Sequence, residues 1–202
     1  ESLASGGNFV DHPGVYHMLV TSVDENPAKQ DGSPLDGVRV GLSVLAGPIN
    51  SNQKDRVFDL MMWNPKPEDT SDKSKKMQTR FCLATCLIGQ HQPGQRVSVE
   101  PTEAVGRQLV VKLAWKQKMD DISGKWIDTD RIDVHFTDIW HVDDVDALKA
   151  GVHLDHAALA MIPAALRKPV VTSPMNGNPV TTAPVGGGST RSAAGAVDLS
   201  NV

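Results

Sequence analysis

The sequence predicts a mainly β protein: a small antiparallel barrel of five to six strands, with one helix between strands three and four. Short C-terminal helices and a disordered tail are expected to follow. Two observations predict this class. Several segments alternate apolar and polar residues with a period of two, which is typical of half-buried strands. A single segment before the C-terminal region has helical periodicity, and it separates the third strand from the fourth.

Length and composition set the domain organisation. The chain has 202 residues, of which 40% are hydrophobic, enough for the core of one domain. The expected divisions are a flexible lead-in over 1–13, an OB-like barrel over 14–142, a helical extension over 143–163 and a disordered tail over 164–202. The tail is expected to be disordered because its Pro, Gly, Ser and Thr residues cannot bury enough apolar surface.

The first three strands are expected before residue 64. They are the segments 15–23, 38–44 and 56–63. The second alternates cleanly, and the third places Phe58, Leu60 and Met62 on one face. Pro65 and Pro67 end the third strand, because proline cannot continue a strand ladder.

A helix is expected next, with Thr70 or Ser71 as its N-cap and Gly89 as its C-cap. The apolar residues at helical spacing are Met77, Phe81, Ala84, Leu87 and Ile88. Cys82 and Cys86 fall on one face of this helix and are expected to be small buried hydrophobes. With only two cysteines, a disulfide framework is not expected, and a reducing compartment is favoured.

Three more strands are expected in the segments 96–100, 106–117 and 126–140. Strands with one helix between the third and fourth have the element order of an OB-fold. An SH3-like barrel or a β-sandwich fits the strand count as well. In the extension, one short helix should end at Gly151 and a second should be capped by Asp155.

Charge is distributed unevenly along the chain. The net charge is −4, but the segment 54–131 holds fourteen Lys and Arg against eleven Asp and Glu, a net of +3. Three of the four tryptophans lie near basic residues in the segment 107–140. A positive groove with aromatic faces for stacking is typical of proteins that bind single-stranded nucleic acid.

Single-stranded DNA is therefore the expected partner. The candidate binding residues are Trp63, Lys66, Lys75, Lys76, Arg80, Arg107, Lys112, Trp115, Lys116, Lys118, Trp126 and Arg131. Trp63 is expected to be exposed and to stack on a base, because it lies opposite the Phe58 face and next to a proline-rich loop. By the same parity argument, Trp115 and Trp126 are expected in the barrel wall.

Catalysis and cofactors are not expected, because no phosphate loop, nucleophile elbow or helical zinc motif is present. A dense group of acids and histidines is the one metal candidate. It comprises His141, Asp143, Asp144, Asp146, His153, Asp155 and His156. Helix capping by Asp143 and Asp155 is the favoured interpretation. No long apolar run or signal peptide is present, so a cytoplasmic protein without membrane contact is expected.

Several short motifs resemble one family. They are Pro13-Gly14-Val15-Tyr16, Val44-Leu45-Ala46-Gly47-Pro48, Phe81-Cys82-Leu83-Ala84, Val105-Gly106-Arg107 and Trp140-His141-Val142-Asp143-Asp144. The part of the chain from about Pro13 to Asp144, which holds these motifs, is similar to a loosely defined group of phage and prophage proteins proposed to bind single-stranded DNA.

The resemblance implies an OB-like barrel and an accessory role in phage DNA replication or recombination, in the bacterial host cell. Replication or recombination proteins would contact the C-terminal tail, although the segment 196–202 holds a single acid, unlike the dense acidic tip of cellular single-strand binders. A homo-oligomer is compatible with this role. The alternative is a protein–protein interaction module without nucleic acid, such as a virion component or an inhibitor of a host system.

Overall fold

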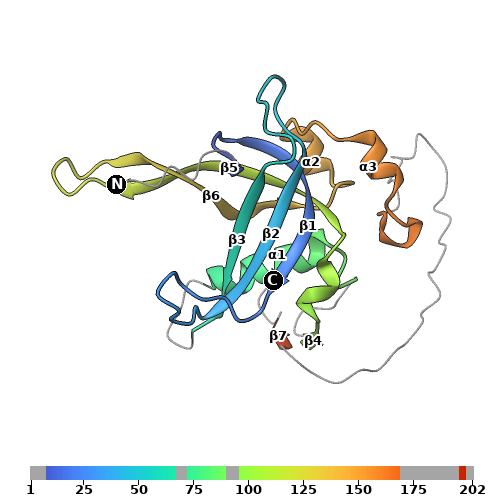
Figure 1. Ribbon diagram of the computed structural model, residues 1–202, viewed down its shortest axis with the longest axis horizontal. Helices are drawn as coiled ribbons and strands as arrows, with labels where there is room; N and C mark the ends of the chain where they lie inside the picture. Colours follow the sequence, from blue (N-terminus) through green and yellow to red (C-terminus); the bar gives the residue numbers. More distant parts are fainter. Residues whose placement is uncertain (1–7, 67–71, 90–95, 169–195, 199–202) are drawn as a thin grey trace, which may run out of the picture.

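The computed structural model describes residues 8–66, 72–89, 96–168 and 196–198 (Figure 1). The protein is mainly β, as the sequence predicts, and its strands form a five-stranded antiparallel sheet in the order β3-β2-β1-β5-β6. These strands are β1 (Gly14–Asp24), β2 (Gly37–Ala46), β3 (Val57–Trp63), β5 (Gln108–Met119) and β6 (Trp126–Trp140).

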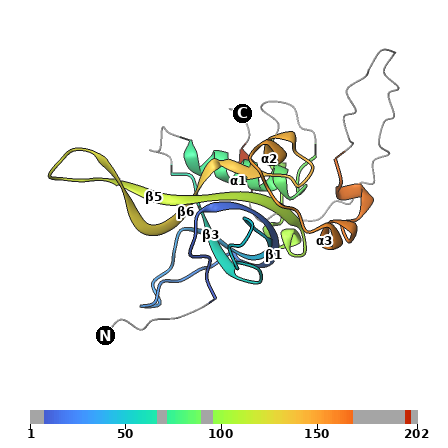
Figure 2. The same cartoon turned by 90° about the horizontal axis from the view of Figure 1, so that it is seen from above.

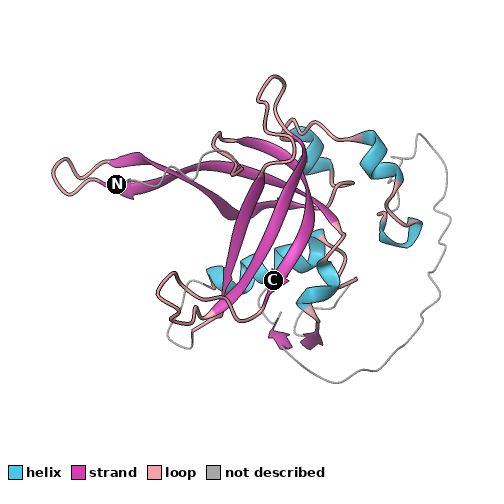
Figure 3. Ribbon diagram, in the orientation of Figure 1, coloured by secondary structure: helices cyan, strands magenta, loops and turns pink. Residues whose placement is uncertain are grey.

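The helices lie at two places around the sheet (Figure 3). The longest, α1 (Lys73–Ala84), runs beneath the strands and contacts both β3 and β6. The C-terminal helices lie on the opposite face of the sheet, where they pack against Val110. They are α2 (Val145–Lys149), α3 (His156–Ala160) and the 3-10 turn η2 (Ala164–Leu166). A second 3-10 turn, η1 (Pro101–Ala104), precedes β5.

The strand order corrects two details of the expected barrel. The segment expected as the fourth barrel strand, β4 (Arg96–Ser98), pairs instead with β7 (Ala196–Asp198) in a separate two-stranded sheet. Among the described residues, β3 and β6 are the edges of the large sheet and are not paired with each other. α1 contacts both of these edge strands, so a helix rather than a strand ladder joins the two sides.

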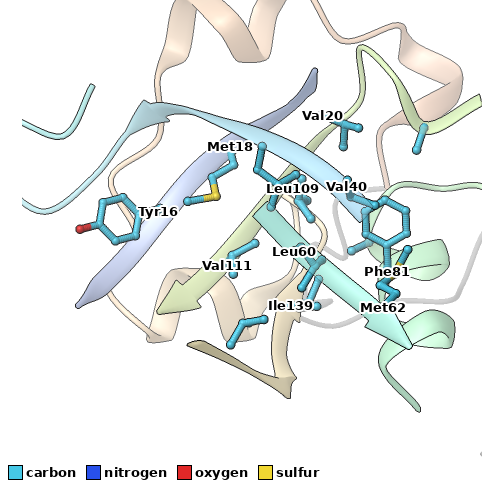
Figure 4. Close-up of a cluster of buried hydrophobic side chains, with 14 of the residues drawn as sticks. Tyr16, Met18, Val20, Val40, Leu60, Met62, Phe81, Leu109, Val111 and Ile139 are labelled. Atoms are coloured by element: carbon cyan, nitrogen blue, oxygen red, sulfur yellow. The ribbon is translucent and has the colours of Figure 1, made fainter. Parts of the chain in front are cut away.

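The main core lies between the sheet and α1 (Figure 4). Its members alternate along β1, β2, β3 and β5, so the predicted period of two is confirmed there. In β6 a register shift places both Val134 and Ile139, five residues apart, in the core. The buried residues drawn from these elements are Tyr16, Met18 and Val20 of β1, Val40 of β2, Leu60 and Met62 of β3, Phe81 of α1, Leu109 and Val111 of β5, and Ile139 of β6.

α1 ends earlier than its sequence predicts. Its last residue is Ala84, and both the amide and the hydroxyl of Thr85 donate to the Phe81 carbonyl, at 2.9 and 2.7 Å. Cys86 then takes a left-handed backbone with φ 55°, which stops the helix. Gly89 is therefore not the C-cap. The predicted N-caps, Thr70 and Ser71, lie outside the described residues.

A second apolar cluster covers the opposite face of the sheet. Val110 points away from the main core and packs with Val142, Ala147 and Leu159 of the C-terminal extension. The two predicted extension helices are present. Gly151 follows α2 with φ 83°, and the Asp155 carboxylate accepts a hydrogen bond from the Ala158 amide at the start of α3. The sheet is thus covered on both faces where β5 meets β1.

The packed part of the chain extends beyond the expected divisions at both ends. Val10, within the expected flexible lead-in, is buried, and its amide donates to the Val57 carbonyl at 2.9 Å. At the other end, Arg167 pairs with Asp143 at 2.5 Å and Lys168 pairs with Asp144 at 2.5 Å. These contacts hold the first residues of the expected tail, and the rest of it, apart from β7, lies outside the described residues.

The β5–β6 hairpin projects from the sheet as an arm, seen in both views (Figures 1 and 2). Leu113 is the last β5 residue that pairs with β1, opposite Gly14, and it also pairs with Val134 of β6. We call residues 114–133 the arm. A register shift between Trp115 and Gln117 gives β6 extra residues there. Such an irregularity bends a hairpin and increases its twist.

Candidate nucleic-acid interface

The arm exposes two of the predicted tryptophans. Trp126 is 63% exposed and Trp115 is 36% exposed, so the expectation that they lie in the barrel wall is wrong. The physical reason is that both residues lie beyond Leu113, where no third strand covers the hairpin. Alternation assigns a side chain to a face, but it does not tell where the neighbouring strand ends.

The tryptophans share one face of the arm, which we call the inner face. Trp115 pairs with Ile132, two residues beyond the buried pair formed by Leu113 and Val134, and therefore continues the core side of the sheet. Met119 pairs with Trp126 and has the same parity. The inner face therefore has apolar residues at the rim of the core and near the hairpin tip, with the hydrogen-bonded pair Gln117–Asp128 between them.

The lysines of β5 lie on the opposite, outer face of the arm. Lys112 pairs with Val15 of β1, and Lys116 and Lys118 follow it at a period of two. Lys116 makes an ion pair with Asp133 at 3.7 Å. The lysines and tryptophans of one strand are thus separated by the sheet, as the period of two predicts.

Acids balance the cations of the arm. Lys116, Lys118, Lys125 and Arg131 supply four positive charges, whereas Asp120, Asp121, Asp128, Asp130 and Asp133 supply five negative ones, a net of −1. Arg131 is exposed in the irregular part of β6. The arm alone is therefore not a positive groove.

The cations of α1 lie on the same side of the sheet as the arm's inner face. Phe81 of α1 shares the main core with Val134, so α1 packs against the core side of β6. The Lys76 ammonium lies over the Phe136 ring, 5.9 Å from its centroid. Lys75 pairs with Asp72 at 3.4 Å, and Arg80 is exposed. Two of the predicted groups, the α1 cations and the arm tryptophans, therefore share a side.

Trp63 is half exposed, as its parity predicts, at 50%. Its carbonyl accepts a hydrogen bond from the Gln78 side chain at 3.2 Å, which places it beside α1. Lys66, three residues further on, is also exposed. Two strands, β2 and β1, separate Trp63 from Lys112 on β5, so the sheet does not make these two predicted residues neighbours.

Arg107 lies apart from the arm. It precedes the end of β5 that is furthest from the hairpin tip, and its guanidinium donates to the carbonyls of Glu103 and Thr85 at 2.9 and 2.8 Å. The structure therefore does not bring Arg107 together with Lys112 and Lys116 as one phosphate-contacting group.

His141 and Asp143 of the extension are used as structural hydrogen-bonding groups, and Asp143, expected as a helix cap, pairs with Arg167 instead. The Asp143 amide donates to Nδ1 of His141 at 3.1 Å, so Nε2 carries the proton and donates to the Leu166 carbonyl at 2.8 Å. Desolvation lowers the pKa of His141. Desolvation acts on Asp143 in the other direction, but its hydrogen bonds with Arg167 and Lys168 hold its pKa below the usual value. Within the described residues, no group of three or more such side chains has the geometry of a metal site.

Both cysteines are free. Cys82 is buried, and desolvation raises the pKa of its thiol to about 12. Cys86 is half buried, and desolvation also raises the pKa of its thiol. A thiolate is the reactive form of cysteine, so neither residue has the environment of a nucleophile.

The alternation of residues along the strands did not predict the exposed apolar side chains at the tip of the arm. Ile122 is 96% exposed, and Met119 and Ile127 are also exposed. A sequence feature does point to them: Ile122 stands inside the polar turn 120–124, where no core is available to bury it.

Within the described residues, no helix is long and apolar enough to span a membrane. Comparison with known proteins finds no family model and no curated protein that matches this chain.

Proposed function

We propose that the protein binds single-stranded DNA with little sequence preference and acts in phage DNA replication or recombination, in the cytoplasm of the bacterial host. The observation that carries the proposal is the exposure of Trp115 and Trp126 on one face of a projecting hairpin. Exposed aromatic surface marks an interaction site, and tryptophan stacks on any base at about 1–3 kcal/mol per base.

The α1 cations supply the charge that the arm lacks. Lys75, Lys76 and Arg80 lie on the same side of the sheet as the tryptophans, whereas the arm itself has a net charge of −1. Three phosphate contacts on a single strand correspond to a slope of about −2 in a plot of log affinity against log salt. We therefore expect a shallow salt dependence, with stacking supplying much of the affinity.

The test is a titration of a fluorescent oligo-dT over a salt series. Trp126→Ala should weaken binding about tenfold, because one stacked base is lost. Lys76→Glu combined with Arg80→Glu should weaken binding and flatten the salt slope. The matched controls are Leu148→Ala and Lys149→Glu, which change an exposed apolar residue and an exposed lysine of α2. Both controls should bind like the wild type.

A second site is tested separately with Trp63→Ala combined with Lys112→Glu. These residues lie on strands that are not neighbours, so a strand that contacts both must cross the sheet. Binding that is unchanged in this variant removes Trp63 and Lys112 from the interface. No binding of the wild type at low salt contradicts the proposed function as a whole.

A protein–protein interaction module is the second candidate function. The arm favours it because its charges nearly cancel, its tip exposes apolar side chains such as Ile122, and the lysines of β5 and α1 lie on different sides of the sheet. If the arm mediates self-association, the wild type should sediment as an oligomer and Trp126→Ala as a smaller species, without any binding of oligo-dT.

A further inference from the structure

A cavity of about 340 Å³ lies between the sheet and the C-terminal extension. Leu19, Leu45 and Ala84 line it from β1, β2 and α1. Met161 and Leu166 line it from the extension. Its volume is at the lower end of the range for small-molecule sites, about 300–1,000 Å³. The walls are therefore those of a small, partly open apolar site between the sheet and the extension.

Three polar side chains that line the cavity make hydrogen bonds within the protein. Nε2 of Gln108 donates to the Ala158 carbonyl at 2.8 Å, and Oε1 of Gln108 is 2.9 Å from Nε2 of His17. His141 is bonded through both ring nitrogens, to Asp143 and Leu166. The hydroxyl of Thr85 donates to the Phe81 carbonyl. Gln108, His141 and Thr85 all line the cavity, and each makes hydrogen bonds to other parts of the protein.

Arg107 is different. A guanidinium has five N–H donors, and the guanidinium of Arg107 forms only two hydrogen bonds with the described residues, both to backbone carbonyls. None of the ion pairs among the described residues includes Arg107, although it is half buried and lines the cavity. A half-buried cation bound only by neutral carbonyls retains both charge and donors for an anion.

We propose that this cavity binds a small amphipathic carboxylate, with its apolar body against the apolar walls and its carboxylate on Arg107. A planar guanidinium matches a carboxylate in shape and in charge. A phosphate monoester, with nearly two negative charges at neutral pH, would leave one charge uncompensated among apolar walls. A macromolecular chain is disfavoured, because the cavity is small and the extension occupies one side of it. The proposal is independent of DNA binding by the arm.

The probes are octanoate, octanol and octylammonium, which share an apolar chain and differ in charge. The full chain is labelled with ¹³C at its methionine methyl groups and titrated by NMR. Octanoate should shift the Met161 resonance saturably, because Met161 lines the cavity, and should leave that of Met119 on the arm unchanged. Octanol should bind about tenfold more weakly, because it lacks the charge-assisted hydrogen bonds, and octylammonium should not bind.

Two variants, Arg107→Gln and Ala158→Phe, and one control variant test which residues bind the probe. Arg107→Gln should reduce octanoate binding to the level of octanol. The matched control is Arg39→Gln, since Arg39 is another half-buried arginine that donates to a backbone carbonyl, that of Ala28 at 2.9 Å. This control should bind octanoate like the wild type. Ala158→Phe, at a position that lines the cavity, should abolish binding of both octanoate and octanol.

Three results would overturn the proposal. One is a Met161 resonance that does not move with octanoate, and another is octylammonium binding as tightly as octanoate. The third is unchanged octanoate affinity in Arg107→Gln. The comparison of the three probes uses the wild type alone, so it decides the question even where a variant does not fold.

Discussion

At the scale of single residues, two buried histidines connect the sheet to the C-terminal extension. The Asp155 amide donates to Nδ1 of His17 at 3.1 Å, so the proton is on Nε2, which donates to Oε1 of Gln108 at 2.9 Å. His141 is used in the same way, with its Nδ1 accepting from the Asp143 amide. A second proton on either ring would point Nδ1–H at a backbone N–H. Both histidines are therefore neutral in the folded protein.

This arrangement predicts that stability falls in mild acid. Desolvation lowers the pKa of His17 and of His141 below the usual value of about 6.5. Below that pH the unfolded chain binds protons that the folded protein does not, so the free energy of unfolding decreases as pH falls. The slope is at most about 1.4 kcal/mol per pH unit for each histidine. Urea denaturation at pH 7.5, 6.5 and 5.5 measures it.

The control for this prediction uses the carboxylates and an exposed histidine. Asp11, Asp143 and Asp155 have lowered pKa values, so their stabilisation is lost only below about pH 4, outside the measured range. His17→Gln should flatten the dependence, whereas a substitution of the exposed His153 should not. A free energy of unfolding that is constant from pH 7.5 to 5.5 contradicts the assignment of neutral, buried rings.

A single glycine tests how closely β2 and β3 pack. A Cβ on Gly37 would lie 2.4 Å from the Met62 carbonyl oxygen, which is backbone and cannot move aside cheaply. Gly37→Ala should therefore destabilise the protein by about 1–3 kcal/mol in urea denaturation. Gly89→Ala is the control, since its Cβ would meet nothing within 4 Å, and it should change stability by less than about 0.5 kcal/mol.

At this scale the sequence predicts roles that depend on neighbours along the chain, but not roles that depend on distant residues. The helix cap Asp155 could be predicted, because capping depends only on neighbours along the chain. The role of His141 could not, because its acceptor, the Leu166 carbonyl, is 25 residues away. The same limit applies to Arg107, whose bond with Thr85 bridges 22 residues. Such roles depend on tertiary packing.

At the scale of elements, the arm should be separable from the fold. Gln117 pairs with Asp128, so an Asn-Gly turn can replace residues 118–127 and close the hairpin there. The residues removed are all exposed except Asp120, which is half buried, so the midpoint of thermal unfolding should change by no more than about 2–4 °C. Binding of oligo-dT should be strongly reduced in the same variant. A shortened protein that binds oligo-dT like the wild type removes the arm tip from the interface.

The elements themselves were largely predictable because their patterns are local. The period of two predicts the strands, and the segment 126–140 matches β6 in full. The pairing partner of β4 was not predictable, since it is β7, about 100 residues away in the sequence. The exposure of Trp126 depends on where β1 begins, because Gly14 sets the point beyond which the hairpin has no third strand. Strand pattern alone contains no such information.

At the scale of the whole molecule, the C-terminal extension should unfold together with the sheet. Val110 lies on β5 between two core residues, Leu109 and Val111, but packs against Leu159 and Val142 of the extension. The loss of the extension would expose Val110 and leave Nδ1 of His17 without its donor. The two apolar clusters share a strand, so we expect one cooperative transition.

Leu159→Ala measures this coupling. The residue is 9% exposed, so its truncation should lower the free energy of unfolding by roughly 2–5 kcal/mol. If the extension and the sheet unfold as one unit, the substitution should lower the free energy of hydrogen exchange at the amides of Leu109 and Val111 on β5. The decrease should equal the decrease in the free energy of global unfolding. Met161→Ala, an 80% exposed neighbour, is the control and should leave protection unchanged. Faster exchange confined to α3, with β5 as protected as in the wild type, would show that the extension opens independently. The packing of Val110 against the extension would then not couple the stability of α3 to that of the sheet.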